Sequence, residues 1–268
     1  MKLEVSRALV IIIMISIFGL SGCQTTGVRP GGMMGNDTSG SLGQSKRTGA
    51  GDVYLRLAVA YMQQGHLGDA LINAKKSVAL DPNNGEAHNV LAIIYSRLGE
   101  NTLADKHFRR AKSLQPKNSY TLNAYGSFLC GQKKYKEADV QFKAALKNPL
   151  YKTPEVALTN AGICARQHKD LDLAEAYLRR ALQHNKNFSV ALLQMAKVSY
   201  ETGDAKAASD FLSRHHKVAK SSPESLWLGI QIGQKLGDRD AVASYSMQLK
   251  GRFPDSTEVK LLKDSLQQ

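Results

Sequence analysis

A repeat of about 34 residues is the feature that most constrains the fold of this 268-residue chain. Pro82, Pro116 and Pro254 fall in one register of that repeat, and alanine or glycine recurs at two fixed offsets from them. A fixed period of roughly 20–50 residues is typical of arrays in which each unit packs mainly on its neighbours. We therefore expect stacked repeats in place of a single globular core.

The recurring small residues indicate two helices per repeat that cross at close range. Glycine also recurs between the two helices, where a positive φ costs little only for this residue. The small residues of the first helix are Ala58, Ala92, Gly126, Gly162 and Ala196, those of the second are Ala70, Ala104, Ala138, Ala174 and Ala208, and the turn glycines are Gly65, Gly99, Gly203 and Gly237. This is the tetratricopeptide (TPR) pattern, which predicts an all-α solenoid: a right-handed superhelix of about six antiparallel helix pairs.

The predicted TPR domain covers residues 51–268. Its repeats run over about 51–84, 85–118, 119–154, 155–188, 189–222 and 223–256, and a capping helix at 257–268 is expected to cover the end of the stack. The sixth repeat is less regular than the others. Ile230 and Val242 stand where small residues are expected, and Gly229 and Ala241 lie one position away.

The N-terminus carries the marks of an exported lipoprotein. Residues 8–20 are apolar and follow Lys2 and Arg7, but they are fewer than the roughly 20 residues that cross a bilayer, so residues 1–22 are expected to be a signal peptide. The sequence Leu-Ser-Gly-Cys at 20–23 resembles a bacterial lipobox. This resemblance implies acylation of Cys23 and, because no Asp follows it, anchoring at the periplasmic face of the outer membrane. The alternative is a signal anchor with an incidental cysteine.

Residues 23–50 are expected to form a flexible tether behind that lipid. The segment from Gln24 to Ala50 holds seven glycines, seven serines or threonines and no apolar periodicity. Such a composition buries too little apolar surface to fold by itself.

Charge and motifs narrow the function classes. The net charge is +13, but the basic residues are scattered over predicted helix surfaces without a nucleic-acid motif, so no nucleic-acid partner is expected. Anionic lipid, peptidoglycan, an acidic partner or a plain solvated basic surface remain open. No catalytic or phosphate-binding motif occurs, and the histidines are spread out; His215 and His216 are expected to be exposed. We predict no enzyme activity, cofactor, metal or small-molecule substrate.

The first helix of each pair is expected to line the concave side of the superhelix, where TPR proteins hold other proteins. Amide side chains there carry both a donor and an acceptor for an extended peptide, and apolar ones suit the face of an amphipathic helix. The candidate partner-binding groove comprises Leu55, Val59, Met62, Asn89, Ile93, Tyr120, Asn123, Asn160 and Ile163. Solvated surface or packing within the array is the alternative role for each of them.

Cys130 and Cys164 are 34 residues apart, which places them on consecutive first helices. Neighbouring helix axes approach to about 8–10 Å, so a disulfide is possible in an oxidising compartment. By the loop-entropy model it would contribute about 3–4 kcal/mol. The alternative is a pair of small buried apolar residues.

Three segments go beyond what helix packing requires: Asn-Ala-Tyr-Gly-Ser-Phe-Leu-Cys at 123–130, Asn-Pro-Leu-Tyr-Lys-Thr-Pro-Glu at 148–155 and Asn-Ala-Gly-Ile-Cys at 160–164. Together with the lipobox and repeats they resemble the PilF/PilW family of type IV pilus biogenesis lipoproteins. That resemblance implies an outer-membrane pilotin, which binds the pilus secretin subunit and supports its localisation and multimerisation. A TPR adaptor lipoprotein for peptidoglycan synthesis or another secretion system is the main alternative. An enzyme regulator, or an enzyme without a recognisable motif, is the other.

Overall fold

The computed structural model describes residues 49–265. They form 13 α-helices, and no strand occurs among them. The six pairs are α1 (Ala50–Gln64) with α2 (Leu67–Leu80), α3 (Gly85–Arg97) with α4 (Asn101–Leu114), α5 (Ser119–Gly131) with α6 (Tyr135–Ala145), α7 (Pro154–Gln167) with α8 (Leu171–His184), α9 (Ser189–Glu201) with α10 (Ala205–Val218), and α11 (Pro223–Leu236) with α12 (Arg239–Arg252). A last helix, α13 (Thr257–Ser265), follows them. The predicted signal peptide and Cys23 lie outside the described residues.

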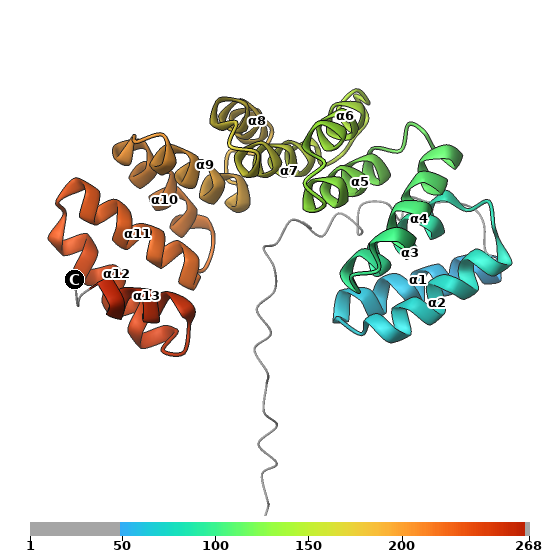
Figure 1. The fold of residues 1–268 in the computed structure, drawn as a ribbon, viewed down its shortest axis with the longest axis horizontal. Helices are drawn as coiled ribbons and strands as arrows, with labels where there is room; N and C mark the ends of the chain where they lie inside the picture. Colours follow the sequence, from blue (N-terminus) through green and yellow to red (C-terminus); the bar gives the residue numbers. More distant parts are fainter. Residues whose placement is uncertain (1–48, 266–268) are drawn as a thin grey trace, which may run out of the picture. The chain divides into compact units, whose positions relative to one another are not determined.

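The prediction of an all-α TPR array is confirmed. Each first helix packs most extensively on its own second helix, and each second helix packs on the first helix of the next pair (Figure 1). Successive first helices also contact one another, from α1 through α3, α5, α7 and α9 to α11, whereas successive second helices have no comparable contact. The first helices therefore line the inner side of the array, and they carry all nine residues of the candidate groove.

The small residues allow the close crossings that the repeat pattern predicts. The alanines at both crossing positions of the first, second and fifth pairs are fully buried. In the third pair a Cβ added to Gly126 would lie 2.8 Å from Cε1 of Phe142, and in the fourth a Cβ on Gly162 would lie 2.7 Å from Cγ of Leu178. Only glycine fits these two crossings without displacement of a neighbour.

The sixth pair crosses in a shifted register, which explains its irregular sequence. A Cβ on Gly229 would lie 2.7 Å from Cδ2 of Tyr245, so the glycine one position before the expected site makes the close contact. Ile230 turns instead into a separate apolar cluster with Val259 and Leu262 of α13. The prediction of a C-terminal capping helix is confirmed by this packing.

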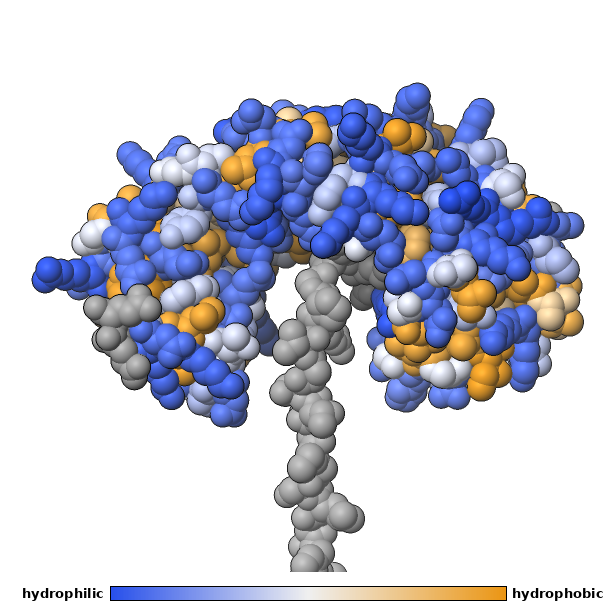
Figure 2. Space-filling model, viewed as in Figure 1, coloured by the Kyte–Doolittle hydropathy of each residue, from blue (hydrophilic) through white to orange (hydrophobic). Residues whose placement is uncertain are grey.

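The opposite end of the array has an uncovered apolar face. Val53 and Leu57 of α1 are 45% and 40% exposed, whereas Ala87 and Leu91, one repeat later, are 0% and 2% exposed. The difference arises because a preceding second helix covers α3 and no described helix precedes α1. Figure 2 shows hydrophobic residues gathered over this end.

The turns within the pairs adopt left-handed backbone at one position in every repeat. Glycine fills it four times, as predicted, with φ between 72° and 96°. In the third and fourth pairs Lys133 and Lys169 take the same conformation, with φ of 60° and 66°. The fold therefore imposes this turn even where the residue type opposes it.

Candidate functional site on the inner helical surface

The apolar members of the candidate groove are buried in the structure. Leu55, Val59 and Met62 of α1 are between 1% and 4% exposed, and Ile93 of α3 and Ile163 of α7 are each 5% exposed. The three residues of α1 and Ile93 belong to the main core cluster of the array. These side chains therefore contribute to packing, and partner contact at them stays a prediction.

The amide members of the groove lie on the first helices α3, α5 and α7. The Nδ2 of Asn160 donates a hydrogen bond to Oδ1 of Asn123 across 3.1 Å, which joins α7 to α5. Asn89 of α3 is also buried, at 6% exposure, but its Oδ1 accepts no hydrogen bond from any described residue. An unsatisfied buried carbonyl costs about 1–3 kcal/mol.

Tyr120 of the candidate groove packs against the loop that follows α6. It lies at the start of α5, where its half-buried ring meets the ring of Tyr151 edge-on, with centroids 5.1 Å apart. Tyr151 belongs to the loop after α6. The structure therefore places Tyr120 beside that loop and brings Asn123 and Asn160 together without it.

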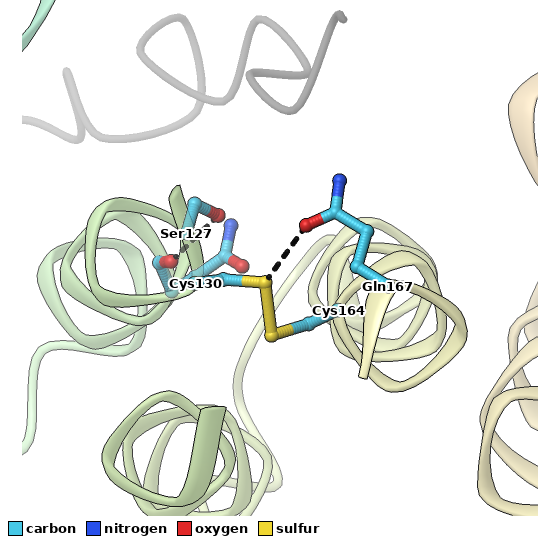
Figure 3. Close-up of a disulfide and its surroundings, with 5 residues drawn as sticks. Ser127, Cys130, Cys164 and Gln167 are labelled. Carbon is cyan, nitrogen blue, oxygen red and sulfur yellow. Dashed lines mark hydrogen bonds between the residues drawn. A yellow bond between two sulfur atoms is a disulfide. The ribbon is translucent and has the colours of Figure 1, made fainter. Parts of the chain in front are cut away.

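A disulfide joins the third and fourth repeats. Cys130 of α5 and Cys164 of α7 are bonded through their Sγ atoms, and their Cα atoms are 5.7 Å apart (Figure 3). Gln167 Oε1 lies 3.6 Å from Cys130 Sγ; because a disulfide sulfur carries no hydrogen, this is a packing contact. Both cysteines are buried, so the bond ties the two first helices directly within the wall.

Polar contacts join further first helices in succession. Arg97 of α3 donates from Nη1 to the carbonyl of Met62 at 3.2 Å, and Arg166 of α7 pairs with Glu201 of α9 at 2.6 Å. Lys197 of α9 pairs with Glu224 of α11, and burial, partly offset by this glutamate, lowers the pKa of the lysine. The sequence analysis missed these pairs, although Arg166 and Glu201 are separated by 35 residues, close to one repeat.

Two histidines pack face to face between α3 and α4. The Nδ1 atoms of His88 and His107 are 2.9 Å apart, so one donates and the other accepts, according to tautomer. Burial, with the neighbouring His88 and Lys106, lowers the pKa of His107 to about 4. The pair favours the neutral state of both rings.

The expectation that His215 and His216 are exposed is wrong. His215 is buried and its Nδ1 lies 2.9 Å from the carbonyl of Ser189, while the half-buried His216 contacts Ser225 Oγ through Nε2 at 3.2 Å. These side chains fill the junctions of α10 with α9 and α11, which a surface assignment from sequence overlooked. Between residues 49 and 265, no group of three or more histidine, cysteine or acidic residues could hold a metal ion.

None of the helices within residues 49–265 is both long and apolar enough to cross a membrane.

Comparison with protein families identifies the repeats. Tetratricopeptide repeat models match residues 51–84, 73–106 and 165–225. The type IV pilus assembly protein PilF of Pseudomonas aeruginosa is 31% identical over 240 residues, which are 90% of this chain and 92% of that protein.

Solved structures give the same relation. The structure reported for the functional characterisation of P. aeruginosa PilF superposes with a TM-score of 0.71 at 31% identity, over 81% of this chain and 97% of that one. The crystal structure of PilW, described as a widely conserved type IV pilus biogenesis factor, superposes with a TM-score of 0.75 at 31% identity, over 81% and 99% of the two chains. With this identity over nearly the whole length of both partners, the chain belongs to the PilF/PilW family of TPR proteins that act in type IV pilus assembly.

Proposed function

We propose that this chain is a non-enzymatic outer-membrane lipoprotein that binds the secretin subunit of the type IV pilus and promotes its localisation and multimerisation. The observation that carries the proposal is the near full-length similarity to PilF, a pilus assembly protein. A TPR array acts by holding other proteins along its inner wall, so a pilus role implies a pilus protein as ligand. An acyl group on Cys23 would keep that wall at the membrane where secretins assemble.

The inner wall of the first four repeats is the proposed contact surface. Its predicted residues are apolar side chains of α1, α3 and α7, which are buried in the free chain, and the amides of Asn89, Asn123 and Asn160. Asn89 is the sharpest candidate among them, because its buried Oδ1 has no donor within the described chain. Because this oxygen is closed to solvent in the free chain, we propose that neighbouring side chains shift on binding and let an N–H of the secretin reach it.

This role of Asn89 can be tested with a matched pair of variants. Gln194 on α9 also has a buried side-chain oxygen without a hydrogen bond from the described residues, but it lies in the fifth repeat. Asn89→Leu and Gln194→Leu each remove an unpaired acceptor at similar volume, so both are expected to fold. Asn89→Leu should reduce secretin multimers in envelope extracts from cells that lack the native protein, and Gln194→Leu should leave them unchanged.

Two results would count against the proposal. If secretin multimers form normally in cells without this protein, it has no role in their assembly. If Asn89→Leu and Gln194→Leu both support normal multimers, the wall near α3 is not the contact surface. Circular dichroism of the purified variants checks that each helical fold is intact.

The membrane part of the proposal depends on Cys23. Cys23→Ala should block acylation and leave precursor with its signal peptide. Mature protein that still fractionates with the outer membrane in this variant would contradict the lipoprotein assignment.

A further inference from the structure

A recess beside the third repeat is not used by the inner wall. The loop 115–118 after α4 and the loop 146–153 after α6 enclose a depression of about 550 Å³. We name it the insert pocket, because the second loop carries the two extra residues of the third repeat. Its lining includes Lys117, Tyr120, Asn148, Leu150, Tyr151 and Lys152.

The sequence of the insert builds an outward-pointing leucine. Asn148 Oδ1 accepts the N–H of Leu150 at 3.0 Å, and the carbonyl of Asn148 accepts the N–H of Tyr151 at 3.1 Å. This turn buries Tyr151 against Tyr120 and leaves Leu150 83% exposed, more than any other large apolar side chain within residues 49–265. Packing within the array therefore gives no reason for a leucine at this position.

The rim of the pocket is positively charged. Lys117 and Lys152 both line it and are exposed. Neither forms an ion pair with any residue from 49 to 265, and no carboxylate lines the pocket. Two uncompensated ammonium groups beside an exposed leucine favour a ligand that is acidic and partly apolar.

We propose that the insert pocket docks an acidic peptide segment of another protein, with an apolar side chain of that segment against Leu150 and the tyrosine pair. The depression is open to solvent and bordered by two loops, so an extended peptide segment can lie along it. Amide side chains such as Asn148 also line it and suit a peptide backbone. Of the residues that line the pocket only Tyr120 belongs to the candidate groove, so the proposal does not depend on the secretin assignment.

Selection from phage-displayed random linear peptides tests the proposal. The bait is the purified full-length protein in detergent, and it is compared with Lys117→Glu/Lys152→Glu and with Lys186→Glu/Lys220→Glu. The second variant has the same net charge and changes two exposed lysines far along the chain. We expect peptides that bind the native protein and Lys186→Glu/Lys220→Glu but not Lys117→Glu/Lys152→Glu. These peptides should be rich in Asp or Glu and contain a large apolar residue.

A synthetic peptide from that set then measures the site by fluorescence anisotropy. Reversal of the two rim charges should weaken its binding about tenfold or more, and Leu150→Asn should weaken it by several fold. Leu150 is largely exposed, so its replacement leaves the fold intact, which circular dichroism checks.

Three results would overturn the proposal. The first is that no peptide depends on Lys117 and Lys152 more than on Lys186 and Lys220. The second is that the selected peptides bind Leu150→Asn as tightly as the native protein. The third is that vesicles containing phosphatidylglycerol bind through the two rim lysines while no peptide does, which would assign the surface to anionic lipid.

Discussion

Replacement of Gly162 with alanine tests how tightly the helix pairs of this array are set. The new Cβ would lie 2.7 Å from Cγ of Leu178, 3.0 Å from its Cδ2 and 3.2 Å from the carbonyl oxygen of Ala174. Cγ is the branch point of a fully buried side chain, and the carbonyl is part of helix α8. Neither can move aside alone, so α7 and α8 must separate.

The expected cost follows from two opposing terms. Overpacking of this kind costs about 1–3 kcal/mol, while alanine is favoured over glycine inside a helix by about 1 kcal/mol. Because this clash meets a branch carbon and a backbone oxygen, we expect overpacking of about 2–3 kcal/mol, which leaves a net loss in the free energy of unfolding of about 1–2 kcal/mol. The fifth pair shows that spacing decides the outcome, because Ala196 and Leu212 occupy the same two repeat positions and are accommodated there.

Urea denaturation followed by far-ultraviolet circular dichroism measures this loss. Gly131→Ala is the control, since a Cβ at Gly131 near the end of α5 would have no atom within 4 Å. That variant should match or slightly exceed the native stability through helix propensity. If Gly162→Ala is as stable as the native protein, or if the two variants shift the urea midpoint alike, the close-crossing argument is wrong.

Three more predictions concern stability. Reduction of the Cys130–Cys164 bond should lower the free energy of unfolding by about 3–4 kcal/mol through loop entropy; a urea midpoint unchanged by dithiothreitol would contradict this. Lys133→Gly and Lys169→Gly should each raise the melting temperature. Left-handed backbone costs a residue with a Cβ about 1–2 kcal/mol, which exceeds the backbone conformational entropy that glycine loses on folding. The pKa of His107 in the folded state, about 4, lies below its ordinary value of 6.5, so the stability that the neutral ring supplies above pH 6.5 is lost as the pH falls toward 4. His107→Gln should therefore lose less stability than the native protein over that pH range, and a parallel loss in both proteins would count against the assignment.

The repeat sequence predicts the fold well because small residues at crossings are a local requirement that recurs in every pair. The prediction of the crossing residue is wrong in the sixth pair, where Gly229 makes the close contact. The register of that crossing depends on the packing of α13, which the repeat pattern does not include. The left-handed turns at Lys133 and Lys169 could not be predicted from residue type either, because the two helices that each turn joins fix its backbone conformation.

The candidate site is less predictable than the fold. Repeat register places Asn123 and Asn160 on neighbouring first helices, but it cannot tell that they bond to each other and that Asn89 has no such donor. Tyr120 satisfies the same register and yet packs against Tyr151, because the two-residue insert brings another ring to that end of α5.

The bond between Cys130 and Cys164 also makes the stability of the chain depend on its compartment. Thiols are kept reduced in the cytosol, so the bond persists only in an oxidising compartment. If the chain is exported as proposed, it therefore lacks this cross-link until it has left the cytosol. Under that proposal, oxidation after export would stabilise the folded array further, because the closed loop lowers the entropy of the unfolded chain.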